Sequence, residues 1–237
     1  MPRLFTNYLG SHLSRGFVLL AVLVLWPAAS VRADEIALFN FNDSNLVRDR
    51  GATGTLTTTV NPANVTFFSG TTVNQQMGDA AGQALALQGG TNNENNGRSL
   101  TLSLSTVGFN SISVSFATQR TATGFNSNQF QYSTDGVTFT DFGALFNPPT
   151  SFSLISFDLT SIAALNNNPN AAFRIVFNGS TSSSSNNRID NLVVSGTAAA
   201  PTAAVPEPTT MLLLGTGLAG VATKIRRRRK PNTDAKV

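Results

Sequence analysis

Hydrophobic and polar residues alternate along much of residues 34–196. In residues 98–105, Leu100, Leu102 and Leu104 share one side, and serine and threonine occupy the other. The same alternation recurs in residues 111–118 and 171–179. A period of two places one face of a strand against a core and the other in water. The pattern therefore predicts antiparallel strands with one buried face and one solvent-exposed face.

Further strands are predicted from composition at residues 36–41, 55–60, 64–68, 84–88, 130–134, 138–142, 151–159 and 188–196. Asp135-Gly136 separates two of these segments and predicts a hairpin turn, because such turns need positive φ. The alternation changes phase between Leu154 and Ile155, which predicts a bulge. Only residues 159–165 have a pattern typical of a short helix.

Some ten or eleven short strands without a long helix predict an all-β body. We expect an antiparallel β-sandwich of the jelly-roll type. Fifteen phenylalanines lie between residues 34 and 204, and most fall in the inward phase of a predicted strand. Their burial is enough to stabilise a core without disulfides.

The N-terminal segment has the features of a secretory signal peptide. Arg3 and Arg15 precede an apolar stretch over residues 17–26, and Val31 and Ala33 supply the small residues of a cleavage site. We therefore expect a signal peptide over residues 1–33, cleaved after Ala33. The alternative is an uncleaved membrane anchor, for which the apolar stretch is short.

The C-terminal segment has three parts. The first is Val205, Pro206, Glu207 and Pro208; the second is the uncharged stretch 209–223; the third is the basic cluster Arg226, Arg227, Arg228, Arg229 and Lys230. As a helix the uncharged stretch reaches roughly 22 Å, short of a hydrocarbon core of roughly 30 Å. A basic cluster acts as a stop-transfer signal, and its long stems extend a short span. The pattern predicts one short C-terminal transmembrane helix.

The combination of VPEP, a Leu- and Gly-rich stretch and RRRRK resembles the PEP-CTERM sorting signal of exported bacterial proteins. The resemblance implies recognition in the cytoplasmic membrane by an exosortase, cutting near Pro-Glu-Pro and delivery to the cell surface or extracellular matrix. Residues 173–196 also resemble the closing strand pair of extracellular jelly-roll modules, including carbohydrate-binding domains, whose last strand carries an aspartate like Asp190. An ordinary tail anchor is the alternative for the tail.

Charge and composition narrow the chemistry. The pI is 10.1, yet residues 34–204 contain six Arg and no Lys against eight Asp and two Glu, a net charge of −4. A nucleic-acid groove is therefore not expected. The chain has no cysteine, and its one histidine, His12, lies in the predicted signal peptide. Catalysis by Ser-His-Asp, Cys-His or Ser-Lys groups and histidine-based zinc sites are excluded for the mature body.

Three kinds of site remain open. A hydrolase could use paired carboxylates such as Glu35 and Glu94, although each acidic residue also has a plainer role in a turn or loop. Structural calcium could bind Asp43 with Asp190 and Asn191, whereas Asp190 could instead bond to backbone or pair with Arg188 or Arg174. Sugar binding usually uses exposed Trp or Tyr, and the body has no Trp and only Tyr132. Sugars could still bind by hydrogen bonds to the asparagine-rich loops 92–96 and 166–170.

The sequence thus predicts five parts: a signal peptide (1–33), a β-sandwich (34–196), a linker (197–204), the sorting signal (205–230) and a polar tail (231–237). We expect a non-enzymatic exported protein, structural or adhesive, whose precursor is anchored in the cytoplasmic membrane and whose mature form is at the cell surface or extracellular. No cofactor is expected. The alternatives are a carbohydrate-binding module of the exopolysaccharide matrix and a carboxylate-dependent hydrolase.

Overall fold

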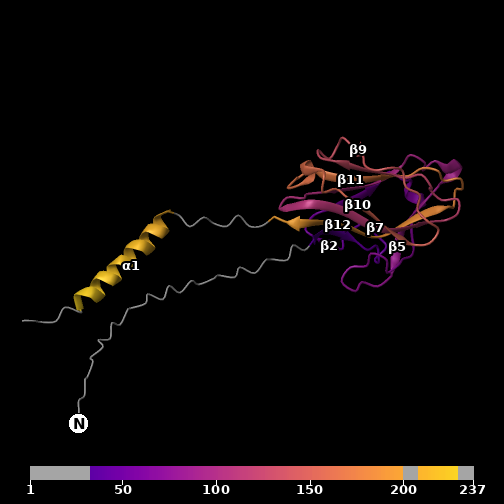
Figure 1. Ribbon diagram of the computed structural model, residues 1–237. Coiled ribbons are helices and arrows are strands. Elements are labelled where there is room, and N and C mark those ends of the chain that lie inside the picture. Colours follow the sequence, from indigo (N-terminus) through magenta and orange to yellow (C-terminus); the bar gives the residue numbers. More distant parts are fainter. Residues whose placement is uncertain (1–32, 200–207, 229–237) are drawn as a thin grey trace, which may run out of the picture. The chain divides into compact units, whose positions relative to one another are not determined.

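A computed structural model describes residues 33–199 and 208–228 (Figure 1). The first range contains only strands and short 3-10 helices, and the second is one α-helix. In chain order the elements are β1 (Ala33–Phe39), β2 (Arg50–Gly51), β3 (Thr55–Thr58), η1 (Pro62–Asn64), β4 (Val65–Ser69), β5 (Gln83–Gln88), η2 (Thr91–Asn93), β6 (Ser99–Leu104), β7 (Phe109–Arg120), β8 (Gln129–Ser133), β9 (Thr140–Asp141), β10 (Ser153–Asp158), η3 (Ala163–Leu165), β11 (Ala171–Val176), β12 (Asn186–Ala198) and α1 (Pro208–Arg228).

Two antiparallel sheets form the body. The seven-stranded sheet runs β10-β7-β12-β1-β2, with β5 also pairing with β12 and β4 pairing with β5. The five-stranded sheet runs β3-β6-β11-β8-β9. The predicted all-β antiparallel sandwich is confirmed, and each predicted strand contains or overlaps an observed one. The two-residue strand β2 was not predicted, because two residues are too few to show an alternation of hydrophobic and polar positions.

The first and last strands of the sandwich are neighbours. In β1, Ala33 pairs with Thr197 of β12, and Phe39 pairs with Leu192. The N-terminal end of β1 and the C-terminal end of β12 therefore lie side by side at one end of this strand pair. The predicted signal-peptide cleavage site, after Ala33, falls at the first residue of β1, and residues 1–32 lie outside the described part.

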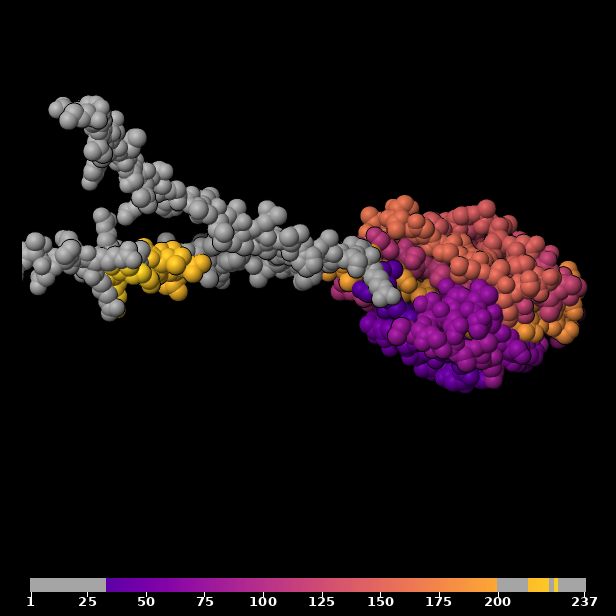
Figure 2. All heavy atoms as spheres, turned by 60° about the horizontal axis from the view of Figure 1, so that its bottom comes forward, coloured from indigo at the N-terminus to yellow at the C-terminus, as the bar shows by residue number. Residues whose placement is uncertain are grey.

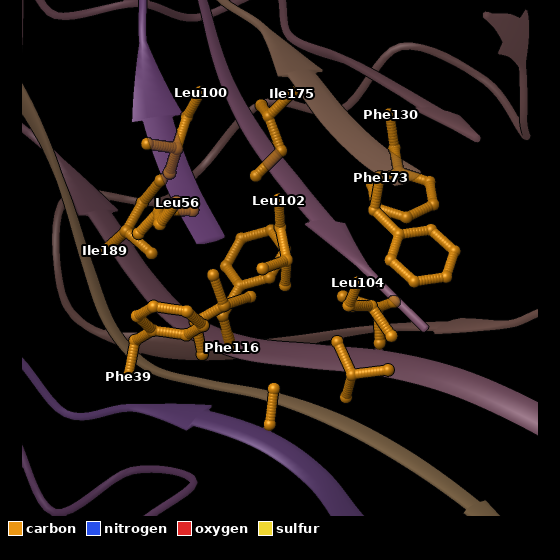
Figure 3. Packing of buried hydrophobic residues seen from close by; sticks show 14 of the residues in the cluster. Phe39, Leu56, Leu100, Leu102, Leu104, Phe116, Phe130, Phe173, Ile175 and Ile189 are labelled. Atoms are coloured by element: carbon orange, nitrogen blue, oxygen red, sulfur yellow. The ribbon is translucent and has the colours of Figure 1, made fainter. Parts of the chain in front are cut away.

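The core lies between the two sheets and is made mainly of leucine, isoleucine and phenylalanine. Leu100, Leu102 and Leu104 of β6 point toward Phe39 and Phe116 of the other sheet (Figure 3). Across the same interface the rings of Phe130 (β8) and Phe157 (β10) stack with their centroids 3.8 Å apart and their planes 7° apart. Each fully buried aromatic stabilises the fold by about 2–3 kcal/mol relative to exposure, and stacking adds to this.

A long connection covers the outer face of the seven-stranded sheet. We call this connection, residues 70–82 between β4 and β5, the strap. Its part of the chain, in purple, lies on the near, lower side of the sandwich in Figure 2. Leu38 of β1 and Val193 of β12 pair in register and are buried, although they lie outside the core cluster. This is the burial expected of a sheet face that is covered by chain.

Three local predictions have different outcomes. The bulge predicted between Leu154 and Ile155 is wrong, because β10 pairs with β7 without a register shift. The phase break arises because Leu154, on an edge strand, points outward and is 54% exposed. The hairpin at Asp135-Gly136 is confirmed as the connection between β8 and β9, with positive φ at Gly136. The short helix is reduced to η3.

The C-terminal segment contains the predicted helix, α1. Its described apolar side chains are exposed, among them Leu213, Leu214, Leu218, Val221 and Ile225. As to the predicted transmembrane span, no helix in the described ranges combines the length and the hydropathy needed to cross a membrane. Glycines and threonines between the leucines lower the hydropathy of α1.

Candidate functional site

The outer face of the five-stranded sheet carries one polar residue from every strand in a single row. Register places Thr57 of β3 beside Thr101 of β6, and Thr101 beside Arg174 of β11. Arg174 in turn pairs with Gln131 of β8, which pairs with Asp141 of β9. Because alternate residues of a strand point to one face, these five side chains lie opposite the leucine and phenylalanine core. We call them the polar row.

Hydrogen bonds fix the longer side chains of the polar row. Nε of Arg174 donates to Oε1 of Gln131 at 2.6 Å, and Nε2 of Gln131 donates to Oδ1 of Asp141 at 2.7 Å. The guanidinium carbon of Arg174 lies 3.7 Å from the centre of the Phe139 ring. An arginine held flat on a ring gains a cation–π contribution and keeps one orientation.

Among residues 33–199 and 208–228 the charge of Arg174 has no direct counter-ion. Burial lowers the pKa of Arg174, and the nearby charge of Asp141 opposes this effect. Within the described residues the only salt bridges within 4.0 Å belong to Arg50, so Asp141 acts on Arg174 from a longer distance. The terminal nitrogens of Arg174 likewise have no hydrogen-bond acceptor in this part of the chain. The guanidinium therefore presents the four N–H groups of its two terminal nitrogens to solvent.

A depression of about 440 Å³ lies beside the polar row on the same sheet. Its floor includes Thr55 of β3 and Ser103 of β6, which are directly paired and exposed. Asn170 and Gly136 form part of its wall. Thr55 and Ser103 are two residues from Thr57 and Thr101 along their strands, so the depression begins about 7 Å from the polar row.

The asparagine-rich loops have mainly structural roles. In the first loop, Glu94 accepts hydrogen bonds from Asn61 and Asn64, and Asn96 exchanges two hydrogen bonds with the backbone of Ser180. In the second loop, Asn168 donates to the carbonyls of Thr134 and Ala164. Asn170 of that loop reaches the depression. The sugar-binding expectation for residues 92–96 and 166–170 is thus untested, and one member lies near the polar row.

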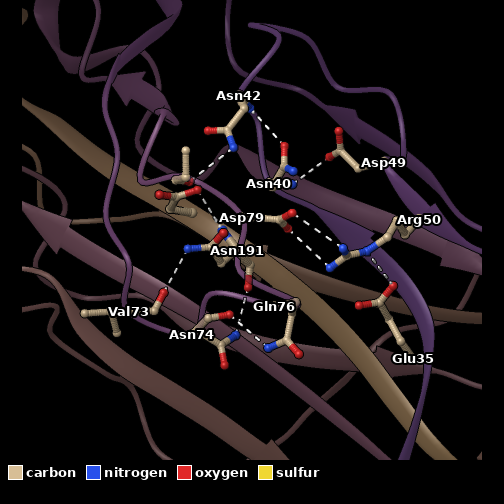
Figure 4. Close-up of polar contacts among 12 residues, drawn as sticks. Glu35, Asn40, Asn42, Asp49, Arg50, Val73, Asn74, Gln76, Asp79 and Asn191 are labelled. Atoms are coloured by element: carbon tan, nitrogen blue, oxygen red, sulfur yellow. Dashed lines mark hydrogen bonds and ion pairs between the residues drawn. The ribbon is translucent and has the colours of Figure 1, made fainter.

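On the opposite sheet, Asp190 and Asn191 of β12 fasten the strap. Oδ2 of Asp190 accepts from the Thr71 amide and Oδ1 from the Asn191 amide, both at 2.8 Å. Nδ2 of Asn191 donates to the carbonyls of Thr71 and Val73, each at 2.9 Å (Figure 4). Gly70 is required at the start of the strap, because a Cβ there would lie 2.5 Å from Oδ2 of Asp190. The predicted backbone role of Asp190 is confirmed, and neither Arg188 nor Arg174 pairs with it.

The Asp190 carboxyl is fully buried. Burial raises the pKa of Asp190 to about 7, although its two amide donors act in the opposite direction. The expected calcium ligands do not form a site with three acidic donors: Asp43 is exposed, and the described residues contain no cluster of three acidic or histidine side chains able to hold a metal. Oδ2 of Asp190 and Nδ2 of Asn191 are instead bonded to the strap.

The other carboxylates also have structural partners. Arg50 connects Glu35, at 3.4 Å, with Asp79 of the strap, at 3.2 Å (Figure 4). Asp135 accepts from the Val137 and Thr138 amides, which lowers the pKa of Asp135. Burial raises the pKa of Asp49, which accepts from the Asn40 amide. These contacts favour structural roles over paired acid and base roles.

The residues of the predicted sorting signal lie partly outside the described ranges. Val205, Pro206 and Glu207 are outside, and Pro208 is the first residue of α1. Arg226, Arg227 and Arg228 end α1, whereas Arg229 and Lys230 are outside the described part. The sorting roles of these residues therefore stay predictions.

Sequence reasoning missed the polar row as a site. Thr101, Arg174 and Gln131 fall in the outward phase of predicted strands, which is a usable signal. These residues lie side by side only because the strand order is β6-β11-β8, which brings together residues up to 73 positions apart. An alternating hydrophobic pattern predicts the face of a strand but not the order of the strands.

Comparison with known proteins identifies one family feature. The family model described as the PEP-CTERM protein-sorting motif matches residues 204–229. The predicted sorting signal is thereby confirmed as a motif of this chain. A comparison with curated proteins finds no match.

Solved structures resemble the chain only distantly. Domain 4 of AbnA, an extracellular arabinanase from Geobacillus stearothermophilus, in complex with arabinotriose, is 16% identical over 76% of this chain and 98% of that one, with a TM-score of 0.45. The CBM22-1 xylan-binding domain of Paenibacillus barcinonensis Xyn10C is 14% identical over 73% and 100%, with a TM-score of 0.43. TmCBM61 with beta-1,4-galactotriose is 9% identical over 65% and 92%, with a TM-score of 0.40. At these values the similarities carry no inference about a ligand.

Proposed function

We propose that this protein is exported and then sorted to the cell surface or extracellular matrix by an exosortase-type membrane enzyme, where it has a structural or adhesive role. The observation that carries the proposal is the PEP-CTERM motif at residues 204–229. The motif follows a sandwich whose last strand ends at Ala198, so the enzyme has a separate segment to act on.

Transient membrane anchoring is part of the proposal. The exposed apolar side chains of α1, such as Leu213 and Leu218, would contact lipid, and the cationic residues after them would remain on the cytoplasmic side. The signal peptide over residues 1–33 would supply the export step. A non-enzymatic role is supported by the absence of histidine, cysteine and lysine from residues 34–204 and by the structural partners of the carboxylates.

The sorting step is tested with a triple alanine substitution at Pro206, Glu207 and Pro208. We expect the precursor to be exported but to accumulate in the cytoplasmic membrane, because the enzyme loses its motif. Pro201→Ala, in the preceding linker, is the matched control and should reach the surface normally. Surface delivery of the triple variant at the normal level would contradict exosortase sorting.

A second candidate function is polysaccharide binding by the outer face of the five-stranded sheet. The observation that favours it is the polar row together with the adjacent depression of about 440 Å³. Hydroxyl, amide, guanidinium and carboxylate groups in fixed positions suit the hydrogen-bonding groups of sugars. A glycan array probed with the whole protein should give binding that is lost when Gln131 and Thr101 are replaced by alanine.

A further inference from the structure

We propose that Arg174 forms a binding site for the carboxylate of an acidic polysaccharide, with a uronic acid residue lying over Thr101 and the neighbouring depression. This inference rests on the second candidate function, polysaccharide binding, and names the class of polysaccharide. It does not depend on the sorting step.

The Arg174 side chain is preorganised for binding. Arg174 is fixed on one side by Gln131, whose Oε1 lies 2.6 Å from Nε, and on its flat face by the ring of Phe139 at 3.7 Å. An arginine side chain usually loses much conformational freedom when it binds a ligand. Here that freedom is already restricted, so a ligand gains more of the interaction energy.

The free N–H groups of Arg174 have the geometry that suits a carboxylate. Because Nε is used by Gln131, the two terminal nitrogens form the free end of the guanidinium. Their parallel N–H groups match the two oxygens of a carboxylate, which is the strongest type of arginine hydrogen bonding. A hydroxyl offers one neutral oxygen, so it cannot reproduce this charged pairing with two oxygens.

Arg174 differs from Arg50 in its ionic partners. Both arginines are partly buried, but Arg50 has Glu35 and Asp79 within 3.4 Å. Arg174 has no carboxylate within salt-bridge distance among the described residues, and its nearest charged neighbour in the row, Asp141, is two strands away. Asp141 reaches Arg174 only through the Gln131 carboxamide, which bonds to both side chains. A partly desolvated cation in this position is completed by an anion from outside.

The surroundings of Arg174 leave space for a sugar ring and limit how closely charges on a ligand can be spaced. On the β6 side of Arg174 the row contains only threonines, Thr101 and Thr57, and the floor of the depression is formed by Thr55 and Ser103. Small hydroxyl side chains leave room for a sugar ring and can bond to its hydroxyls. Asp141, on the other side, disfavours a ligand with closely spaced charges. The site therefore fits a polymer with one carboxylate per sugar better than a densely sulfated one.

The experiment uses the full chain in mild detergent and short oligomers of galacturonate and of mannuronate, each compared with its neutral methyl ester. Isothermal titration calorimetry should detect binding of at least one acid and about tenfold weaker binding of its ester. Higher salt should weaken binding of the acid and leave the ester unaffected. A densely sulfated glycan serves as a third ligand.

Four variants locate the interaction. Arg174→Gln should lower the affinity for the acid to that of the ester, and Arg174→Lys should lower it severalfold because the paired donors are lost. Gln131→Glu should also weaken binding, because a carboxylate inside the protein would then compete for the guanidinium. Arg98→Gln removes the same charge from an exposed arginine and should change the affinity by less than twofold. Circular dichroism confirms that each variant is folded.

The outcomes separate the two proposals. If acid and ester bind equally and Arg174→Gln has no effect, the carboxylate site is wrong while polysaccharide binding stands. If the sulfated glycan binds as tightly as the acid, the assignment to uronic acids is wrong. If neither acid nor ester binds and the glycan array is also blank, both proposals fail.

Discussion

The sandwich and the C-terminal helix differ in the exposure of their hydrophobic side chains. In the sandwich, Phe116, Phe130 and Ile112 are at most 1% exposed, and the net charge of residues 34–204 is −4. In α1, Leu213 is 76% exposed and Leu218 is 64% exposed, and cationic residues follow directly. The sandwich buries its apolar side chains in its own core. The apolar side chains of α1 are exposed and are suited to contact with an external partner, as a sorting signal requires. The two regions should therefore respond independently to mutation.

The largest expected effect concerns location. A chain that ends at residue 204 should be exported without the membrane stage and should not become a substrate of the exosortase. Its unfolding free energy should change by less than about 0.5 kcal/mol, because surface changes distant from the core have little effect. Cell fractionation and urea denaturation measure the two quantities. A large loss of stability would show that the regions depend on each other.

The largest effect within the sandwich is expected for Asn191. Asn191→Ala removes two hydrogen bonds from partly buried carbonyls of the strap and leaves alanine at a φ of 49°. Loss of about 3–5 kcal/mol in unfolding free energy should follow. Asn191→Gly is the control for backbone strain and should recover about 1 kcal/mol. Sorting of any folded molecules should be unchanged.

Asp190 should make stability depend on pH. Its pKa is raised to about 7 by burial, from 3.8, so the folded state binds a proton that the unfolded state releases. The contribution of Asp190 to the unfolding free energy should therefore be highest below pH 4, and it should fall as the pH rises toward and through 7. Arg188, two residues away on β12, donates to the Ser69 carbonyl.

The measurement compares urea midpoints at pH 5 and pH 8 for the natural chain and for Asp190→Asn. The natural chain should lose more stability between these values than the variant, which cannot titrate at this position. Asp49 also has a raised pKa and contributes in the same direction, so the difference between the two chains is the informative quantity. Equal slopes for the two chains would contradict the role of Asp190.

A smaller effect is expected for Arg50, which joins β2 to β1 and to the strap. Its side chain is 33% exposed, so its ion pairs with Glu35 and Asp79 are partly screened. Arg50→Gln should cost up to about 1 kcal/mol, and the loss should shrink in high salt. A loss as large as that of Asn191→Ala would mean that charge pairing, not the Asn191 contacts, holds the strap.

Much of the fold could be predicted because it depends on local patterns. The alternation around Leu100 and around Phe173 identified strands β6 and β11, and Gly136 identified the β8–β9 turn. The strap could not be predicted, since its attachment joins Thr71 to Asp190 across 119 residues. The polar row was missed for the same reason: Gln131 and Arg174 are adjacent only through strand order. The sorting motif was readable because all its residues are contiguous.

The most direct test of the central claim is the C-terminus of the protein recovered from its host. Intact-mass and peptide mass spectrometry of surface and extracellular fractions should find chains that end near Pro206 to Pro208, with residues 209–237 missing. Recovery of surface-exposed chains that still end in the basic cluster and residues 231–237 would contradict processing at the sorting motif.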